Sequence, residues 1–512
     1  MRAVVLLVIV ALLAVAGCGG DGDVGSGEEL KVLSYFPPDA TAAAVVSTDV
    51  DGDQFRNLDR LVRRQGEQGV EGFLRGWAQS VDLSYEDDLK PLLGNEVAVG
   101  IVDTGAFRDD FLSGVMAAFH TADEDKLQEV LEKIEYLEPA GELSGADLYR
   151  IRGTSLTLAR DGDVVLFAGR EEPLRAALER ADSDEHLGDA FDEALADLDG
   201  DALLRVYGDL ERAVEGAGVG ELERLRALPW VAALRTAGLT LSFGDEDVTL
   251  DFALNADADA VEEADLPLAT GEEAPEILRR DGEVTGGNRN QSLTTAFLFG
   301  AAEVAFPDSR FVRDVHALEE ELGIDFVDEV LRQFDGPSAS SVSVDGETFA
   351  ARSEVSDPEG LKEILPRLGP HLPRLVTGLQ GLQSEGQALL FIFAPDALVL
   401  QADRVRVTQE GDLWRVTGLE GEGPDELWFG VLEDVFVVAS TEALARQVAT
   451  EETVEVEGAR GAGVLRVDLS RAPPAALERF DLDDFGRVGE LVAWLEASEE
   501  RLRGQVRVEV PD

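Results

Sequence analysis

Residues 164–178 read VVLFAGREEPLRAAL, and residues 434–448 read DVFVVASTEALARQV. Each stretch contains a short apolar run with the length and composition of a buried strand. After a brief polar turn, each continues with apolar residues at helical spacing. The chain of 512 residues therefore carries a strand, a turn and an amphipathic helix twice, 270 residues apart.

Three other matches occur in the same order in both halves. Residues 203–206 (LLRV) match residues 464–467 (VLRV), and residues 148–151 (LYRI) match residues 413–416 (LWRV). Earlier in each half, an aspartate precedes a helical pattern of leucine, isoleucine and valine; these segments are 123–131 and 357–365. Because the order is the same throughout, the matches predict an internal duplication.

The spacing of the matches differs at one place. The first matched helices lie 234 residues apart, but the later strand–helix pairs lie 270 apart. The second copy therefore has about 36 extra residues, which we place near 371–406. This insert contains the apolar run Ala388–Phe393 (ALLFIF). The run is either an added core strand or part of the wall of a lipid-sized cavity between sheet and helices.

Alternating apolar and polar residues predict strands with one buried and one wet face. Val248, Leu250, Phe252 and Leu254 alternate with polar or small residues, and Val506, Val508 and Val510 do so near the C-terminus. This pattern favours antiparallel pairing. Strands mostly follow strands, without regular βαβ alternation, so the predicted fold class is α+β. We expect two tandem copies of an antiparallel sheet covered by amphipathic helices.

The predicted domain organisation follows from these patterns and from composition. We expect a lipoprotein signal peptide at 1–17, an acylated cysteine with a Gly- and acid-rich tether at 18–34, and a first α+β repeat at 35–255. An acidic, Pro-containing linker follows at 256–292, with a short helix expected around Pro275–Arg280. The second repeat then covers 293–512 and includes the insert.

The N-terminus has the features of an export signal. A positive start at Met1-Arg2 precedes the apolar or small stretch Ala3–Gly17, which is shorter than the roughly 20 residues of a membrane-spanning helix. The stretch ends in Val15-Ala16-Gly17-Cys18, which resembles the lipobox of bacterial lipoproteins. That resemblance implies cleavage before Cys18 and attachment of diacylglycerol and a fatty acid such as palmitate to it. The alternative is a plain N-terminal anchor with an idle cysteine.

Net charge supports an anchored protein with no nucleic-acid partner. Asp and Glu total 104 and Lys and Arg 44, which gives a formal net charge of −60. Such a field repels nucleic acids and anionic membrane surfaces. A lipid on Cys18, the sole cysteine, would instead hold the protein at the extracytoplasmic face of the cell membrane. The tether at Gly19–Glu29 has a root-mean-square reach of roughly 18 Å.

Several of these features occur together in one known group of proteins. They are the lipobox at Cys18, the glycine-rich tether, the sequence Phe36-Pro37-Pro38-Asp39-Ala40 before the strand-like Ala43–Val46, and the repeated α+β pattern. The chain thereby resembles bacterial (actinobacterial-type) predicted lipoproteins filed as a domain of unknown function. The resemblance implies no activity, cofactor or catalytic residue.

Motifs for catalysis and cofactor binding are absent from the sequence. It contains no P-loop, no HExxH and no GxSxG motif, so we predict no catalytic or cofactor-binding residue. Its histidines are His120, His186, His316 and His371, and none has a second likely ligand three or four residues away. We therefore expect locally satisfied histidines and no metal site.

Acidic turns at Asp49–Asp53 and Asp197–Asp201 each place three carboxylates around a glycine. They could be calcium loops or ordinary acidic turns, and they lack the EF-hand spacing. Asp481, Asp483 and Asp484 form a weaker group. Three functional classes remain: a non-enzymatic binding or interaction protein of the cell envelope, a carrier of a lipid or other apolar ligand, and a carboxylate-dependent hydrolase. The first is favoured, and the chain is not expected to be an enzyme.

Overall fold

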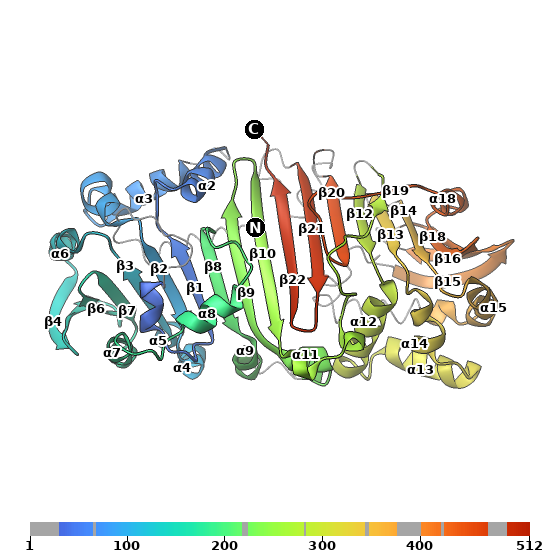
Figure 1. Cartoon of the computed structure of the whole chain (residues 1–512), viewed down its shortest axis with the longest axis horizontal. Helices are drawn as coiled ribbons and strands as arrows, with labels where there is room; N and C mark the ends of the chain where they lie inside the picture. The colour runs from blue at the N-terminus through green and yellow to red at the C-terminus, as the bar shows by residue number, and fades with distance from the viewer. Residues whose placement is uncertain are drawn as a thin grey trace.

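A computed structural model describes residues 30–64, 68–217, 224–280, 283–343, 348–375, 401–420, 424–468, 470 and 489–511. Among these residues, twenty strands form one continuous sheet that runs along the long axis of the molecule (Figure 1). Neighbouring strands of this sheet pair in antiparallel fashion. Helices pack against it, so the predicted α+β class is confirmed.

The first half of the sheet contains ten strands. In chain order they are β1 Ala42–Ser47, β2 Glu96–Ile101, β3 Val115–His120, β4 Leu137–Leu143, β5 Ala146–Ile151, β6 Thr157–Asp161, β7 Val164–Ala168, β8 Leu204–Asp209, β9 Leu234–Phe243 and β10 Asp247–Ala256. From the outer edge to the middle, the order is β4, β5, β6, β7, β3, β2, β1, β8, β9, β10.

The second half repeats this order. Its strands are β12 Glu283–Asn288, β13 Ser338–Ser343, β14 Phe349–Glu354, β15 Gln401–Glu410, β16 Leu413–Glu420, β17 Glu426–Leu432, β18 Val435–Ala439, β20 Gly463–Asp468, β21 Glu490–Ala497 and β22 Arg501–Glu509. From the opposite edge inward they run β15, β16, β17, β18, β14, β13, β12, β20, β21, β22. Numbered within each half, both orders are 4-5-6-7-3-2-1-8-9-10.

The two halves meet where β10 pairs with β22, and we call this pair of strands the seam. The pairing runs from Asp247 opposite Glu509 to Asn255 opposite Arg501. Each half thus contributes its last strand, as equivalent edges do in a symmetric dimer. The sequence predicted two tandem sheets, whereas the structure joins both halves into one.

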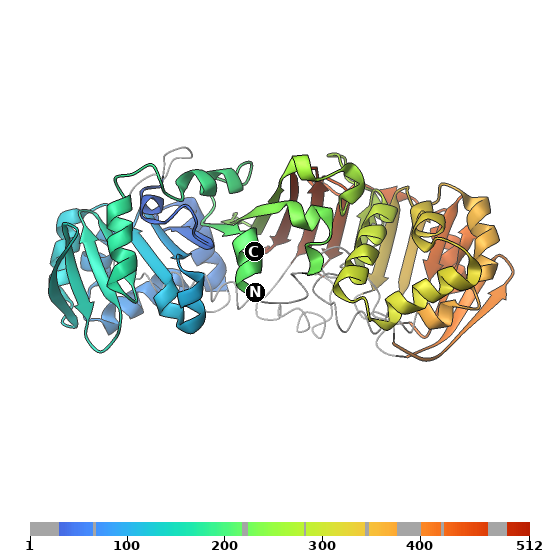
Figure 2. The ribbon, with the colours of Figure 1, turned by 90° about the horizontal axis from the view of Figure 1, so that it is seen from below.

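Helices cover both faces of the outer strands (Figure 2). In the first half, Val46 packs toward α2 and α3, whereas its neighbour Val45 packs toward a short 3₁₀ helix, η1, and toward α7. The run at Val164–Ala168 (β7), predicted to be a buried strand, is indeed buried at four of its five positions. The first-half helices are η1 Lys31–Tyr35, α2 Asp53–Arg64, α3 Gly69–Ser80, η2 Tyr85–Leu89, α4 Thr104–Asp109, α5 Phe111–Gly114, α6 Glu124–Lys133, α7 Glu171–Arg180, α8 Gly188–Ala194, α9 Leu210–Ala217 and α11 Pro229–Ala233.

Helices of the second half follow the same plan. They are α12 Gln291–Ala305, α13 Arg310–Leu322, α14 Phe326–Glu329, α15 Pro358–Leu368 and α18 Glu442–Val448. Helices α6 and α15 begin after Asp123 and Asp357, whose carboxylates accept N–H groups of the first turn. Helices α7 and α18 begin after Arg170 and Thr441, which are 271 residues apart, one more than the letter match suggested.

Three predicted boundaries need correction. Leu30 and Val32 are buried in the core, so the folded part includes residues 30–34, which the sequence-based prediction places in the tether. The expected helix at Pro275–Arg280 is wrong: β11 (Ile277–Leu278) pairs with β19 (Thr453–Val454), and both residues of β11 are fully buried. Strand β12 lies inside the predicted linker 256–292. Within the insert, residues 376–400 lie outside the described part, and β15 begins at Gln401.

Candidate functional site

The central strands present one apolar face, which follows from their register. Across the seam, Leu204, Leu241, Leu250, Val506, Ala493 and Leu465 form one row on neighbouring strands. Val206, Leu239, Phe252, Gly504 and Leu495 form the next row on the same side. We call these two rows the central apolar face. None of their side chains carries a charge or a hydrogen-bonding group.

Much of the central apolar face keeps some contact with solvent. Of its side chains, Leu250, Phe252 and Val506 are only half-buried, unlike the fully buried side chains of the outer core. With strands about 4.8 Å apart, the six strands of the longer row span about 24 Å.

Phe252 and Leu495 lean over Gly504 at the middle of this face. A Cβ atom at Gly504 would lie 2.5 Å from Phe252 Cζ and 2.7 Å from Leu495 Cδ2. The glycine therefore leaves room that these two side chains occupy. Because Phe252 Cζ and Leu495 Cδ2 belong to flexible side chains rather than to the backbone, these two side chains can move when a ligand binds.

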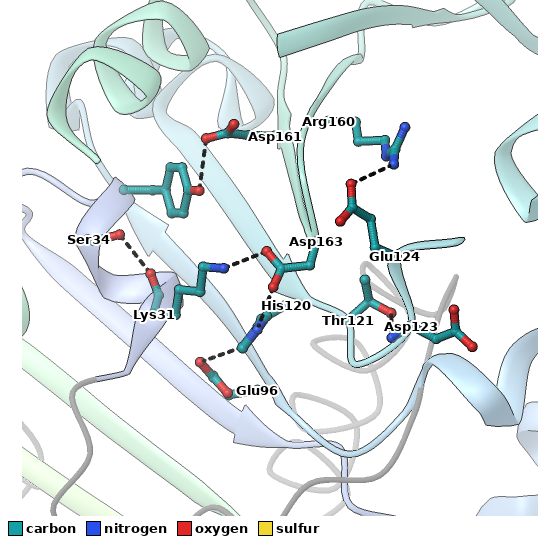
Figure 3. Close-up of polar contacts among 11 residues, drawn as sticks. Lys31, Ser34, Glu96, His120, Thr121, Asp123, Glu124, Arg160, Asp161 and Asp163 are labelled. Carbon is teal, nitrogen blue, oxygen red and sulfur yellow. Dashed lines mark hydrogen bonds and ion pairs between the residues drawn. The ribbon is translucent and has the colours of Figure 1, made fainter. Parts of the chain in front are cut away.

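Apart from the central apolar face, a group of polar residues surrounds His120 at the end of β3 (Figure 3). His120 Nδ1 lies 3.3 Å from Glu96 Oε1, and its Nε2 lies 3.3 Å from Asp163 Oδ2. Lys31 Nζ of η1 lies 2.5 Å from the other oxygen of Asp163. Burial alone would raise the pKa of Asp163, but the hydrogen bond and charge of Lys31, together with His120, hold this pKa below its ordinary value.

The contacts of this group tie the first folded residues to the sheet. Tyr35 donates its hydroxyl to Asp161, 3.0 Å away, and burial and that carboxylate raise the pKa of Tyr35. Thr121, the residue after His120, has a hydroxyl oxygen that accepts the N–H of Asp123. Within the part of the chain that the structure describes, the polar contacts of His120 are with carboxylates, which gives it no nucleophile to activate.

A cleft of about 430 Å³ lies between α2, α3 and η2. Its walls include three carboxylates, and each of them already bonds a cation: Asp51 with Lys90 at 3.0 Å, Glu71 with Arg75 at 2.8 Å, and Asp59 with Arg63 at 2.5 Å. A carrier of apolar ligands needs an apolar lining. This charged cleft therefore does not match the predicted cavity.

The carboxylates of the acidic turns accept backbone N–H groups of their own turns or pair with nearby arginines. Asp49 accepts the N–H of Asp51, and Asp53 pairs with Arg56. Asp199 accepts the N–H of Asp201, and Asp197 lies 3.1 Å from Arg501. No group of three or more His, Cys, Asp or Glu residues that could hold a metal occurs in the described ranges. Asp481, Asp483 and Asp484 lie outside those ranges.

The other predicted site residues are scattered. His316 lies 3.0 Å from both Glu303 and Glu319, and His371 lies 3.7 Å from Glu321. His186 accepts the N–H of Gly188. The structure brings none of these near His120, and Cys18 lies outside the described residues. In that described part, no helix combines the length and the apolar character needed to cross a membrane.

Comparisons with known proteins identify a family but no activity. A family model described as "Protein of unknown function (DUF3352)" matches residues 1–268, just over half of the chain. No curated protein matches. Among solved structures, crystal form III of TP0453 is 11% identical over 44% of this chain and 79% of its own, with a TM-score of 0.26. Crystal form IV of the same protein is 10% identical over 44% and 80%, with a TM-score of 0.27. TM-scores this low do not indicate a shared overall fold.

Proposed function

We propose that this chain, which belongs to the DUF3352 family of proteins of unknown function, is a membrane-anchored extracytoplasmic lipoprotein that binds an apolar ligand. It acts as a binding protein of the cell envelope and not as an enzyme. The observation that carries the proposal is the central apolar face. Its half-buried leucine, valine and phenylalanine side chains stand out in a protein with 104 acidic residues.

The chemistry of this face favours an acyl chain or a similar apolar molecule over a protein surface. Protein interfaces carry about one hydrogen bond per 100–200 Å², and the two rows of the face offer no hydrogen-bonding side chain. Burial of apolar surface contributes about 25 cal/mol per Å². One acyl chain spans half of a bilayer core that is about 30 Å thick. The row across six strands is about 24 Å long, so it is long enough for an acyl chain.

The proposed anchor and the proposed ligand fit one location. A net charge of −60 keeps the folded part away from anionic headgroups. A lipid on Cys18 would hold it nearby, and a tether would give it freedom to receive an apolar molecule. We further propose that the two halves are copies of one ancestral unit. Their identical strand order and the collinear sequence matches support this interpretation.

Cys18→Ala is expected to abolish lipid attachment. In cells fed an alkyne analogue of palmitate, wild-type protein should be labelled and sediment with membranes, whereas the variant should be unlabelled and remain in the soluble fraction. The matched control is Ser26→Ala in the tether, which keeps the lipobox. Equal labelling of wild type and the Cys18→Ala variant would contradict the proposed anchor, but it would not test the proposed binding of an apolar ligand.

The ligand is tested on the full chain extracted from membranes in mild detergent. Native mass spectrometry should show a mass above that of the acylated polypeptide, and extraction with organic solvent should remove this excess. An apolar molecule should then be found in the extract. A population with only the acylated mass, which also fails to take up a fluorescent palmitate analogue, would refute ligand binding.

A further inference from the structure

The opposite face of the seam carries an unusual group of arginines. On β22, Arg503, Gln505 and Arg507 point away from the central apolar face, because they alternate with Gly504 and Val506. Trp494 of β21 lies opposite Gln505 and donates its indole N–H to the Gln505 side chain at 3.2 Å. Gln505 in turn donates to Asp251 at 2.9 Å. These contacts hold the Gln505 side chain in place between Arg503 and Arg507.

A third arginine approaches from the loop before β20. The guanidinium carbon of Arg460 lies 4.4 Å from the centre of the Trp494 ring, and that of Arg503 lies 5.8 Å from it. The same loop passes Arg507: a Cβ atom at Gly458 would lie 3.9 Å from Arg507 Nη1. Trp494 itself is only 2% exposed. Two guanidinium groups therefore lie over one buried indole, and that of Arg507 lies beside the loop that carries Arg460.

These arginines lack the partners that other arginines of the sheet have. Arg501 pairs with Asp197 and Arg466 pairs with Glu490. In contrast, within the described ranges no carboxylate oxygen lies within 4.0 Å of the side chains of Arg460, Arg503 or Arg507, and none of the three guanidinium groups donates a hydrogen bond. The Arg503 Nε atom is buried and has no acceptor. A buried donor without a partner costs about 1–3 kcal/mol.

The electrostatic environment of Arg503 also favours a bound anion. Burial and the charge of Arg460 lower the pKa of Arg503, although the charges of Asp251, Glu496 and Asp197 oppose this shift. Neighbouring positive charges that pair directly with no carboxylate repel one another, which is unexpected where acids outnumber bases by more than two to one. A bound anion would remove the repulsion and satisfy Arg503 Nε.

We propose that Arg460, Arg503 and Arg507 form an anion site that takes a phosphate group above Trp494. Guanidinium groups bind phosphate oxygens in pairs of parallel hydrogen bonds, and three of them match a group with several oxygens and up to two negative charges. The site lies on the face of the sheet opposite the proposed apolar ligand and does not depend on that ligand. The phosphate can come from free phosphate or from a lipid headgroup.

Titration of the detergent-extracted full chain with inorganic phosphate tests the site. At ionic strength matched with sodium chloride, calorimetry should detect one phosphate per chain, and the Tm should rise with phosphate but not with chloride. Arg503→Gln combined with Arg507→Gln should weaken binding at least tenfold. Arg446→Gln is the matched control, because Arg446 pairs with Glu442 on α18 and lies outside the group; it should bind like wild type.

Further arms separate folding effects from binding and identify the source of the phosphate. The double variant should keep its Tm in chloride, since removing unpaired charges relieves repulsion; if its Tm falls, Arg460→Gln in the loop replaces it. Binding of inorganic phosphate supports a free ligand, whereas binding only of phosphatidic acid in detergent, compared with phosphatidylcholine, supports a headgroup. Binding of neither, or equal binding by wild type and arginine variants, overturns the proposal.

Discussion

Replacing Gly238 with alanine is expected to lower the free energy of unfolding by about 3 kcal/mol. Gly238 lies in β9, and a Cβ atom there would overlap the carbonyl oxygen of Ala194 and lie 3.0 Å from its carbonyl carbon. This carbonyl cannot easily move, because it accepts a hydrogen bond from Asn255 of β10 at 3.2 Å. Two residues later, the carbonyl of Ala196 accepts from Arg501 of β22 at 2.8 Å. The clash therefore disturbs both strands of the seam.

Gly208→Ala provides the matched control on the adjacent strand β8. A Cβ atom at Gly208 would have only the Cβ of Ala237 within 4 Å, at 4.0 Å. This change should be neutral or stabilise by up to about 1 kcal/mol, since alanine restricts the unfolded chain. Urea unfolding followed by far-UV circular dichroism measures both variants. Equal stabilities for the two would show that the end of α8 does not pack on β9 as described.

The seam explains which parts of the fold the sequence could predict. The strand–turn–helix segments 164–178 and 434–448 are predictable from local apolar runs and helical spacing, because both signals lie within fifteen residues. The pairing of Asp247–Asn255 with Arg501–Glu509 joins segments about 250 residues apart. Each of these strands alternates correctly in the sequence, but alternation does not name a partner. The union of both halves in one sheet was therefore not predictable.

Tertiary contacts also explain why the local prediction of secondary structure was wrong at Pro275–Arg280. The sequence predicts a short helix around Pro275–Arg280, yet Ile277 and Leu278 pair with Thr453 and Val454. A Cβ atom at Gly287 of β12 would lie 2.8 Å from the carbonyl oxygen of Glu276, so the absence of a side chain there admits β11. A run of two apolar residues carries no period, and distant packing fixes its conformation.

The candidate sites show the same limit. The sequence singled out histidines and acidic turns, which the structure places in separate, internally paired groups. The central apolar face needs strands from both halves, whereas the arginine group comes from β21, β22 and the loop before β20, all in the second half. Arg503 and Arg507, four residues apart on one face of a strand in an acidic chain, are a detectable signal, but Trp494 and Arg460 join them only through the sheet.

Phe252→Asp is expected to weaken binding of a fluorescent palmitate analogue about 100-fold. A fully buried phenylalanine side chain contributes roughly 1.5–3 kcal/mol, and a carboxylate in its place would have to lose its hydration against an acyl chain. About 2.7 kcal/mol corresponds to the 100-fold change. Because Phe252 is only half-buried and leans over Gly504, the protein should still fold. Fluorescence titration measures the affinity, and circular dichroism monitors the fold.

Thr249→Asp is the matched control, since it adds the same charge to the same strand on the opposite face. Thr249 pairs with Arg507 across the seam and points away from the central apolar face. It should leave affinity for the palmitate analogue within about twofold of wild type, a difference of roughly 0.4 kcal/mol. If both variants weaken binding equally, the cause is the added charge or a disturbed seam. If Phe252→Asp binds like wild type, the apolar ligand does not lie on this face, because a carboxylate at its centre could not escape contact with it.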